Sequence, residues 1–175
     1  MNKVYGIFGI ISGFIEIGLM HYYYINELFM KREYNLLYRS LTVLILAMSV
    51  VFAIIAVKKI NGNVISFMRS MFTGFMVSLI NGLTKWLLFT CIYFFNADLL
   101  VKPEKFAKVE FIKNMATNKN PDINVSEGLQ NLHNLFTPGG FLMPNMFSSF
   151  VFGMITAIFV TAFVYNRSEQ VSWPE

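Results

Sequence analysis

Residues 72–95 read FTGFMVSLINGLTKWLLFTCIYFF, and this stretch decides the fold class. At about 1.5 Å per residue, a helix of this length exceeds the roughly 30 Å of hydrocarbon in a bilayer. An unpaired backbone group in hydrocarbon costs several kcal/mol, and a helix avoids that cost because its hydrogen bonds are internal. Lys85 is the one charged side chain in the run. We therefore predict a transmembrane helix that carries a charge in need of a partner.

Three further runs are long and apolar enough to cross a membrane, at residues 4–23, 41–57 and 147–165. The composition agrees, because 55% hydrophobic residues and 14% charged residues lie outside the usual range of soluble proteins. The first run has little early charge and no small-residue cleavage site, so we expect a retained helix and not a signal peptide. The prediction is an all-α protein, a four-helix transmembrane bundle formed by one domain over residues 1–175.

The long connection between the third and fourth spans, about residues 99–137, has an amphipathic pattern. Pro103 suits the first turn of one helix, and Ser126 is the expected N-cap of a second. Residues 137–140, TPGG, should end that second helix. The pair is too weakly apolar to span, so we expect it outside the membrane, capping the bundle or resting on the bilayer surface.

The shorter connections differ in kind. Residues 24–40 mix charged and apolar side chains, which favours an interfacial helix leading into the second span. Residues 61–63, Asn-Gly-Asn, predict a turn before the third span. The basic residues near this turn and the termini lie in short segments, which weigh most in the positive-inside rule. We therefore predict that both termini are cytoplasmic and that the long connection lies outside.

Small residues recur at intervals of four along three of the spans, which favours close helix packing in a membrane. They are Gly9 and Gly13 in the first span, Gly74, Ser78 and Gly82 in the third, and Gly153 and Ala157 in the fourth, with Ser149 and Thr161 in the same stripe.

Glu16 and Lys85 lie at the same predicted depth, because both spans start on the same side and each residue is roughly 18 to 20 Å into its helix. A lone charge at mid-membrane costs about 2.5 to 3.5 kcal/mol on insertion scales, so we expect an ion pair between them. Asn81 lies on the same face as Lys85. The expected role is to hold the first and third helices in register, and a proton- or substrate-linked role is the alternative.

Other distinctive side chains have simpler interpretations. His21 and the tyrosines at 22–24 suit the headgroup level at the end of the first span. Trp86 is expected to pack on a neighbour or cover the stem of Lys85. Cys91 is expected to be a small buried apolar residue.

Several classes of function lack support in the sequence. The net charge of +4 is dispersed and forms no basic block, so nucleic acid is not an expected partner. One cysteine and two histidines provide no metal-ligand spacing. Recognised catalytic motifs are missing, so we predict no enzyme activity, no cofactor and no metal.

The order of features resembles the bacterial membrane family catalogued as domain of unknown function 4199, seen mainly in Bacteroidota. The residues that carry the resemblance are Ile65-Ser66-Phe67, Phe72-Thr73-Gly74-Phe75, Tyr93-Phe94-Phe95-Asn96 with Pro103 after it, and Phe136-Thr137-Pro138-Gly139-Gly140-Phe141. The resemblance implies a multi-pass protein of the bacterial inner membrane. It implies no activity and no catalytic residue.

Three functions remain as hypotheses. The leading one is an accessory or scaffold subunit of a larger membrane assembly, with the lipid bilayer and other membrane subunits or further copies of the chain as partners. The alternative is a small oligomeric channel or carrier in which Glu16, Asn81 and Lys85 line a path. A lipid-handling partner of a membrane glycosyltransferase is a third possibility without residue-level support.

Overall fold

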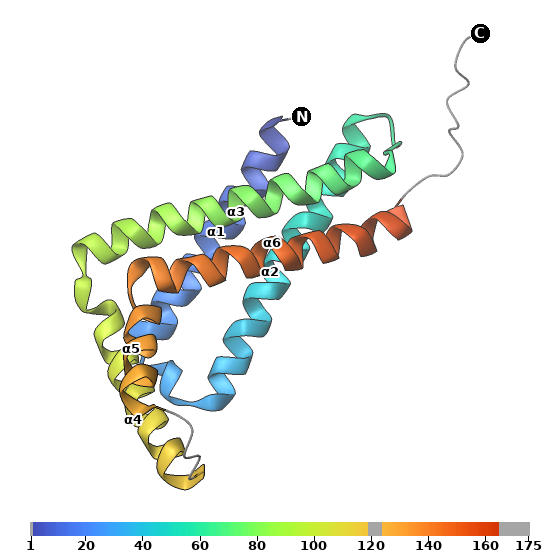
Figure 1. The fold of residues 1–175 in the computed structure, drawn as a ribbon. Coiled ribbons are helices and arrows are strands. Elements are labelled where there is room, and N and C mark those ends of the chain that lie inside the picture. The colour runs from blue at the N-terminus through green and yellow to red at the C-terminus, as the bar shows by residue number, and fades with distance from the viewer. Residues whose placement is uncertain (1, 119–123, 165–175) are drawn as a thin grey trace.

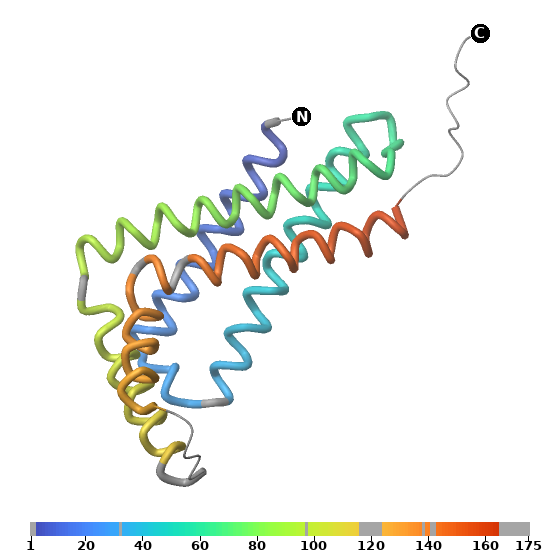
Figure 2. Tube along the Cα trace, in the orientation of Figure 1, coloured from blue at the N-terminus to red at the C-terminus, as the bar shows by residue number. Residues whose placement is uncertain are grey.

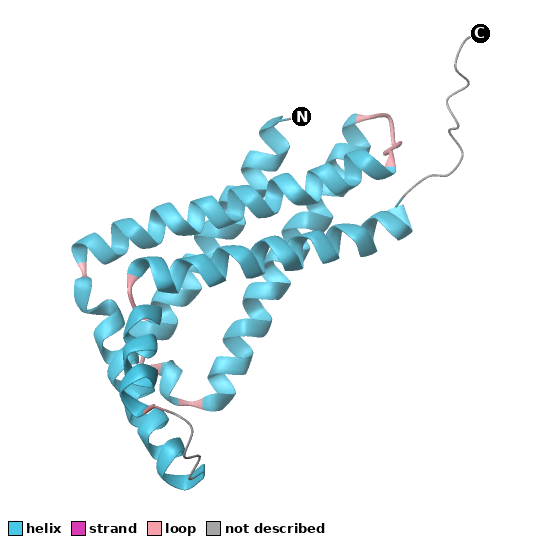
Figure 3. Ribbon diagram, viewed as in Figure 1, coloured by secondary structure: helices cyan, strands magenta, loops and turns pink. Residues whose placement is uncertain are grey.

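The computed structural model describes residues 2–118 and 124–164, and every regular element in these ranges is helical (Figures 1 and 3). Within these two ranges, six α-helices and two short 3₁₀ helices follow one another. In order they are α1 (Asn2–Ile25), η1 (Leu28–Met30), α2 (Arg32–Ile60), α3 (Phe67–Phe95), η2 (Ala97–Leu100), α4 (Val101–Asn118), α5 (Val125–Leu135) and α6 (Pro138–Val164).

Four of these helices are long and apolar enough to cross a membrane, and they are α1, α2, α3 and α6. The apolar parts run over Lys3–Ile25, Glu33–Ile60, Phe67–Phe95 and Met143–Val164. This confirms the predicted all-α class and the four long apolar helices. Helices of this length and composition indicate a membrane protein.

Helix α3 lies at the centre of the bundle and packs against both α1 and α6, while α2 contacts all three (Figure 1). The α1–α3 contact depends on two of the predicted glycines. A Cβ atom at Gly9 would lie 2.7 Å from Cβ of Ile80, and one at Gly13 would lie 2.7 Å from Cβ of Thr84. These distances are shorter than carbon atoms tolerate, so the two helices approach this closely only because both positions lack a side chain.

The α3–α6 contact uses small residues from both helices. A Cβ atom at Gly74 would overlap Cβ of Ala157, and one at Gly153 would overlap the hydroxyl of Ser78. Gly82 is buried too, but a Cβ atom there would meet Met146 at an ordinary 3.8 Å. Of the two predicted packing glycines in α3, Gly74 is therefore required by the close helix contact and Gly82 is not.

One predicted boundary in the first half of the chain is wrong. The segment 24–40 does not form a separate interfacial helix, because α2 begins at Arg32 and continues without a break to Ile60. Only the short η1 helix lies between α1 and α2. The turn at 61–63 is present, and both Gly62 and Asn63 have positive φ angles, of 68° and 67°.

Two boundaries in the second half also differ. Helix α5 begins after Asn124, whose side chain accepts a hydrogen bond from the Ser126 backbone N–H at 3.1 Å, so Asn124 is the N-cap in place of Ser126. Helix α5 ends at Leu135, just before residues 137–140, as predicted. The same residues also begin α6, whose first residue is Pro138, because proline suits the first turn of a helix. Helix α6 therefore starts well before residue 147, and Tyr165 lies outside the described residues.

Helices α4 and α5 form a hairpin at the end of the bundle opposite the N-terminus (Figure 2). Leu99 and Leu100, just before α4, are buried with Ile17, Met20 and Phe89 of the spans. Phe106 of α4 packs on Phe29 of η1 with ring centroids 5.8 Å apart, so the hairpin caps the bundle, one of the two arrangements expected for it.

Candidate functional site

Glu16, Asn81, Lys85 and Ser149 meet in one polar cluster inside the bundle. Lys85 of α3 places its Nζ 2.7 Å from Oε2 of Glu16 on α1, and the Glu16 side chain is only 4% exposed. The structure therefore brings together the two charges that the sequence placed at the same depth. The ion pair offsets the cost of placing either charge among apolar helices.

Asn81 completes the link between α1 and α3. Its Nδ2 donates to Oε1 of Glu16 at 2.9 Å and to the hydroxyl of Ser12 at 2.8 Å. Ser12 in turn donates to the Gly9 carbonyl at 3.1 Å. Each Glu16 oxygen thus accepts a hydrogen bond, and the carboxylate is held in a single orientation.

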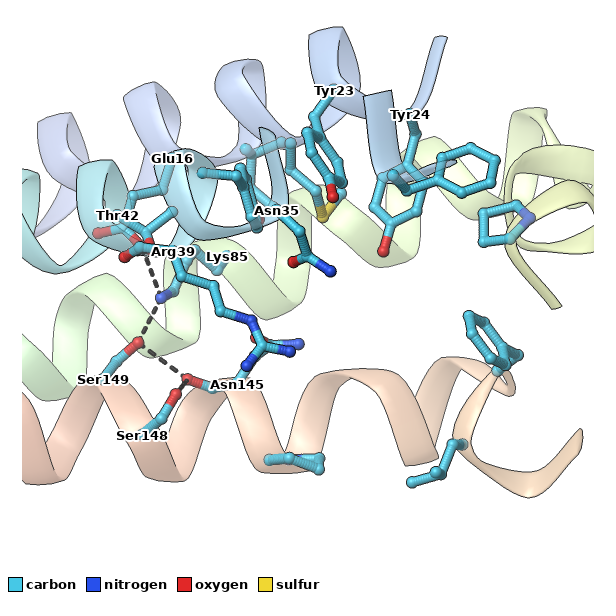
Figure 4. A pocket seen from close by; sticks show the side chains of 18 of the residues that line it. Glu16, Tyr23, Tyr24, Asn35, Arg39, Thr42, Lys85, Asn145, Ser148 and Ser149 are labelled. Carbon is cyan, nitrogen blue, oxygen red and sulfur yellow. Dashed lines mark hydrogen bonds and ion pairs between the residues drawn. The ribbon is translucent and has the colours of Figure 1, made fainter. Parts of the chain in front are cut away.

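Helix α6 joins the same cluster through Ser149. Lys85 donates to the Ser149 hydroxyl, which donates to the Asn145 carbonyl at 2.9 Å (Figure 4). The sequence placed Ser149 in a packing stripe and did not identify it as a partner of Lys85. The cluster connects three helices and balances one positive charge with one negative charge.

A cavity of about 810 Å³ begins at this cluster and extends to the α4–α5 hairpin. Its walls come from α1, α2 and α6, and Glu16, Lys85 and Ser149 line its inner end. Arg39 and Asn145, which also line the cavity, are exposed. The volume lies within the range of small-molecule binding sites in proteins.

No protein-family model, curated protein or solved structure matches this chain. The proposed function therefore depends on the geometry of the cavity and its lining. The resemblance to a bacterial membrane family stays a prediction.

Tyr23, two residues before the end of α1, faces the interior of the bundle. The residue is 5% exposed, and its ring stacks on Tyr38 of α2 with centroids 4.6 Å apart. Glu16, Met20 and Tyr23 follow one another at steps of four and three, so all three face the cavity. Tyr22, on another face of α1, is 61% exposed, as a residue at the bilayer interface would be.

The Tyr23 hydroxyl is buried and has no hydrogen-bond partner among the described residues. In Figure 4 the hydroxyls of Tyr23 and Tyr24 point away from α1 toward the space that α6 borders on the other side. A buried hydroxyl without a partner is unfavourable, so this group is suited to a ligand in the cavity.

Arg39 of α2 also lines the cavity, and the sequence interpretation missed this role because it placed Arg39 in a connection. The side chain extends from α2 into the space between α2 and α6 (Figure 4). Within residues 2–118 and 124–164, its guanidinium forms no ion pair with a carboxylate. The available signal was the amphipathic pattern of residues 32–43, which places Asn35, Arg39 and Thr42 on one face.

The hairpin that closes the outer end is held by polar contacts. Glu104 of α4 pairs with Lys108 at 2.6 Å and with Nδ1 of His133 on α5 at 2.8 Å. Hydrogen bonds from Lys108 and then from His133 hold the pKa of the Glu104 carboxyl below its usual value of 4.5. A second ion pair joins Lys102 of α4 to Glu27, which precedes η1.

One sequence expectation for α3 does not hold. Cys91 is exposed and not buried, because it lies off the stripe of α3 that faces α1 and α6. Trp86 is 44% exposed and therefore faces outward in large part. The described part of the chain contains no group of three His, Cys, Asp or Glu residues that could hold a metal ion.

Proposed function

We propose that the protein is a non-enzymatic membrane protein that binds an amphiphilic molecule in the cavity between α1, α2 and α6, and acts as a carrier. This develops the carrier hypothesis drawn from the sequence. The observation that supports it is the cavity of about 810 Å³, which extends from the Glu16–Lys85 pair to the hairpin.

The lining of the cavity is both polar and apolar, which suits an amphiphile. Polar groups come from all three walls, and they include Tyr23 of α1, Asn35 of α2 and Ser148 of α6. Apolar side chains lie between them, and they are Ile17, Met20, Val43, Leu46 and Phe152. A small soluble ligand would leave the apolar side chains uncovered, and a hydrocarbon would leave the polar groups without hydrogen bonds.

Photo-crosslinking in vesicles tests the proposal. The full chain is reconstituted in phosphatidylcholine vesicles that contain a phospholipid with a diazirine in its acyl chain, and the adducts are mapped by mass spectrometry. We expect saturable adducts on Val43 or Phe152 of the lining, in addition to adducts on outward residues such as Phe159 and Phe163. Adducts restricted to the outward residues would contradict the proposal.

A matched variant separates the cavity from the outer surface. Ser148→Trp places a large side chain on the α6 wall, where the serine bonds only within its own helix, to the Asn145 carbonyl at 3.0 Å. The cavity adducts should disappear, and the adducts on Phe159 and Phe163 should stay.

An accessory-subunit role is a second candidate, and the hairpin supports it. Outside the four spans, Val109 is 62% exposed and Ile112 of the same helix is 51% exposed, and Leu135 of α5 is 51% exposed. Apolar side chains on an extramembrane hairpin suit a contact with another membrane subunit. Crosslinking from a photoreactive residue at position 112 in native membranes would give a discrete protein adduct if this role is correct, and lipid adducts alone if it is not.

A further inference from the structure

The charges that line the cavity do not balance. Lys85 and Arg39 are positive and Glu16 is negative, so the lining has one positive charge in excess. Glu16 is already paired with Lys85 at 2.7 Å. The unbalanced charge is therefore that of Arg39, and an anion bound in the cavity would meet it.

Arg39 lies at the depth of a lipid headgroup. It is seven residues after Arg32, the first residue of α2, and therefore about 10 Å along the helix. The Glu16–Lys85 pair lies deeper, nine residues before the end of α1 and ten before the end of α3. The polar end of a ligand thus belongs near Arg39, and its apolar part belongs beside Val43 and Leu46, which follow Arg39 on α2, and Phe152, which follows Ser149 on α6.

Tyr23 provides an independent observation that points to a ligand. Its side chain is buried, it lines the cavity, and its hydroxyl has no partner in the described part of the chain. A phosphate oxygen would accept the hydrogen bond that this hydroxyl cannot donate within the protein. A guanidinium group binds phosphate with two parallel hydrogen bonds, so Arg39 and Tyr23 together provide donors for one phosphate group.

We propose that the cavity holds one anionic phospholipid, with its phosphate on Arg39 and the Tyr23 hydroxyl and an acyl chain among Val43, Leu46 and Phe152. The inference rests on the proposed function and names its ligand class. A soluble anion such as inorganic phosphate shares the headgroup chemistry, but it would leave those apolar side chains uncovered. The helical hairpin covers the headgroup end, where Phe106 and Leu132 complete the lining.

The test compares two lipids that differ in headgroup charge. The full chain in mild detergent is titrated with phosphatidylglycerol or with phosphatidylcholine of the same acyl chains, and bound lipid is counted by native mass spectrometry. We expect one tightly bound phosphatidylglycerol and an affinity about tenfold higher than that for phosphatidylcholine, the size expected for a charge-assisted hydrogen bond.

Three variants locate the site. Arg39→Gln should remove the preference for phosphatidylglycerol. Lys31→Gln removes a cation at the same end of the bundle, outside the cavity, and should leave the preference unchanged. Tyr23→Phe should weaken phosphatidylglycerol binding severalfold without loss of thermal stability, because the lost hydroxyl has no partner in the protein.

Specific outcomes overturn the inference. If both lipids bind with equal affinity and Ser148→Trp abolishes the binding of each, the cavity binds lipid as proposed. The inference that this lipid is anionic would then be wrong. A preference that persists in Arg39→Gln would place the anion elsewhere, and unchanged binding in Tyr23→Phe would remove the hydroxyl contact. Binding of inorganic phosphate with no retained lipid would identify a site for a soluble anion and overturn the lipid assignment.

Discussion

Glu16 and Lys85 each offset the cost of burying the other's charge inside the bundle. The Lys85 side chain is 13% exposed and the Glu16 side chain 4%, so water provides little solvation to either. Asn81 and Ser149 supply further hydrogen bonds to the pair. A buried ion pair stabilises a fold only when such additional bonds are present, and this pair has them on both sides.

Removal of one partner should therefore cost more than removal of both. Lys85→Met leaves the Glu16 carboxylate without its cation, and we expect a loss of about 3 kcal/mol in the free energy of unfolding. The double variant Glu16→Gln, Lys85→Met should recover at least half of that loss, because no charge stays buried. Unfolding of the purified protein by a titration with sodium dodecyl sulfate measures both.

Lys59→Met is the matched control, since Lys59 is exposed at the end of α2 and its loss should change stability little. A double variant as unstable as Lys85→Met would show that the pair contributes through hydrogen bonds and shape and not through charge balance.

The sequence located these two charges because depth follows from counting residues along a helix. It did not identify Ser12, Ser149, Tyr23 or Arg39 as part of the site. Serine and tyrosine in a span have several ordinary roles, so their type is a weak signal. Arg39 was missed because the start of α2 lies nine residues before the predicted start of the span.

The helix contacts of α3 depend on individual glycines, and this gives a prediction with an internal control. Gly74→Ala introduces a methyl group that overlaps Cβ of Ala157, so α3 and α6 must move apart. We expect a loss of about 1 to 3 kcal/mol, the usual cost of overpacking. Gly82→Ala meets Met146 at 3.8 Å and should be neutral in the same detergent titration.

A neutral Gly74→Ala variant would show that the α3–α6 interface is loosely packed. Loss of stability in Gly82→Ala to the same degree would show that helix glycines are required here for a reason other than close approach.

The contact between α4 and α5 should depend on pH through Glu104. The pKa of this carboxyl is lowered by hydrogen bonds from Lys108 and His133, so the contact is stabilised when the carboxylate is ionised. That stabilisation is present above the ordinary value of 4.5 and is lost as pH falls through the lowered pKa. The amide hydrogens of α5 should therefore exchange more slowly in the native protein than in the Glu104→Gln variant at pH 7.

Comparison with Glu104→Gln at each pH removes the intrinsic pH dependence of exchange. The difference in protection between the two proteins should be present at pH 7 and should vanish below the lowered pKa. A difference that is the same at every pH would assign the α4–α5 contact to packing, such as that of Phe111 on Gly128.

The four long apolar helices could be predicted from the lengths of the apolar runs, but the residues at which they begin and end could not. The end of an apolar run marks where the bilayer ends, and a helix continues past that point wherever its backbone stays satisfied. Helix α2 extends through charged residues to Arg32, and α6 begins at Pro138 in what the sequence suggested was a loop. The cavity could not be predicted, because it forms where the first half of α2 and the first half of α6 face one another across the bundle.

The whole molecule has two distinct ends. The start of α1, the turn between α2 and α3, and the end of α6 lie toward one end, and Lys58 donates to the Val164 carbonyl there at 3.1 Å (Figure 1). The α4–α5 hairpin lies toward the other. The positive-inside rule predicts that the first end faces the cytoplasm, and the headgroup end of the cavity would then lie in the outer leaflet.

Cysteine labelling of intact cells tests this orientation. In a Cys91→Ser background, a membrane-impermeant thiol reagent should label Lys31→Cys and Lys105→Cys, which are exposed at the hairpin end. Lys3→Cys and Lys59→Cys, exposed at the other end, should react only after the membrane is opened. The reverse pattern would invert the orientation and place the Arg39 level in the inner leaflet, whereas labelling of one residue from each pair would contradict the four-span arrangement itself.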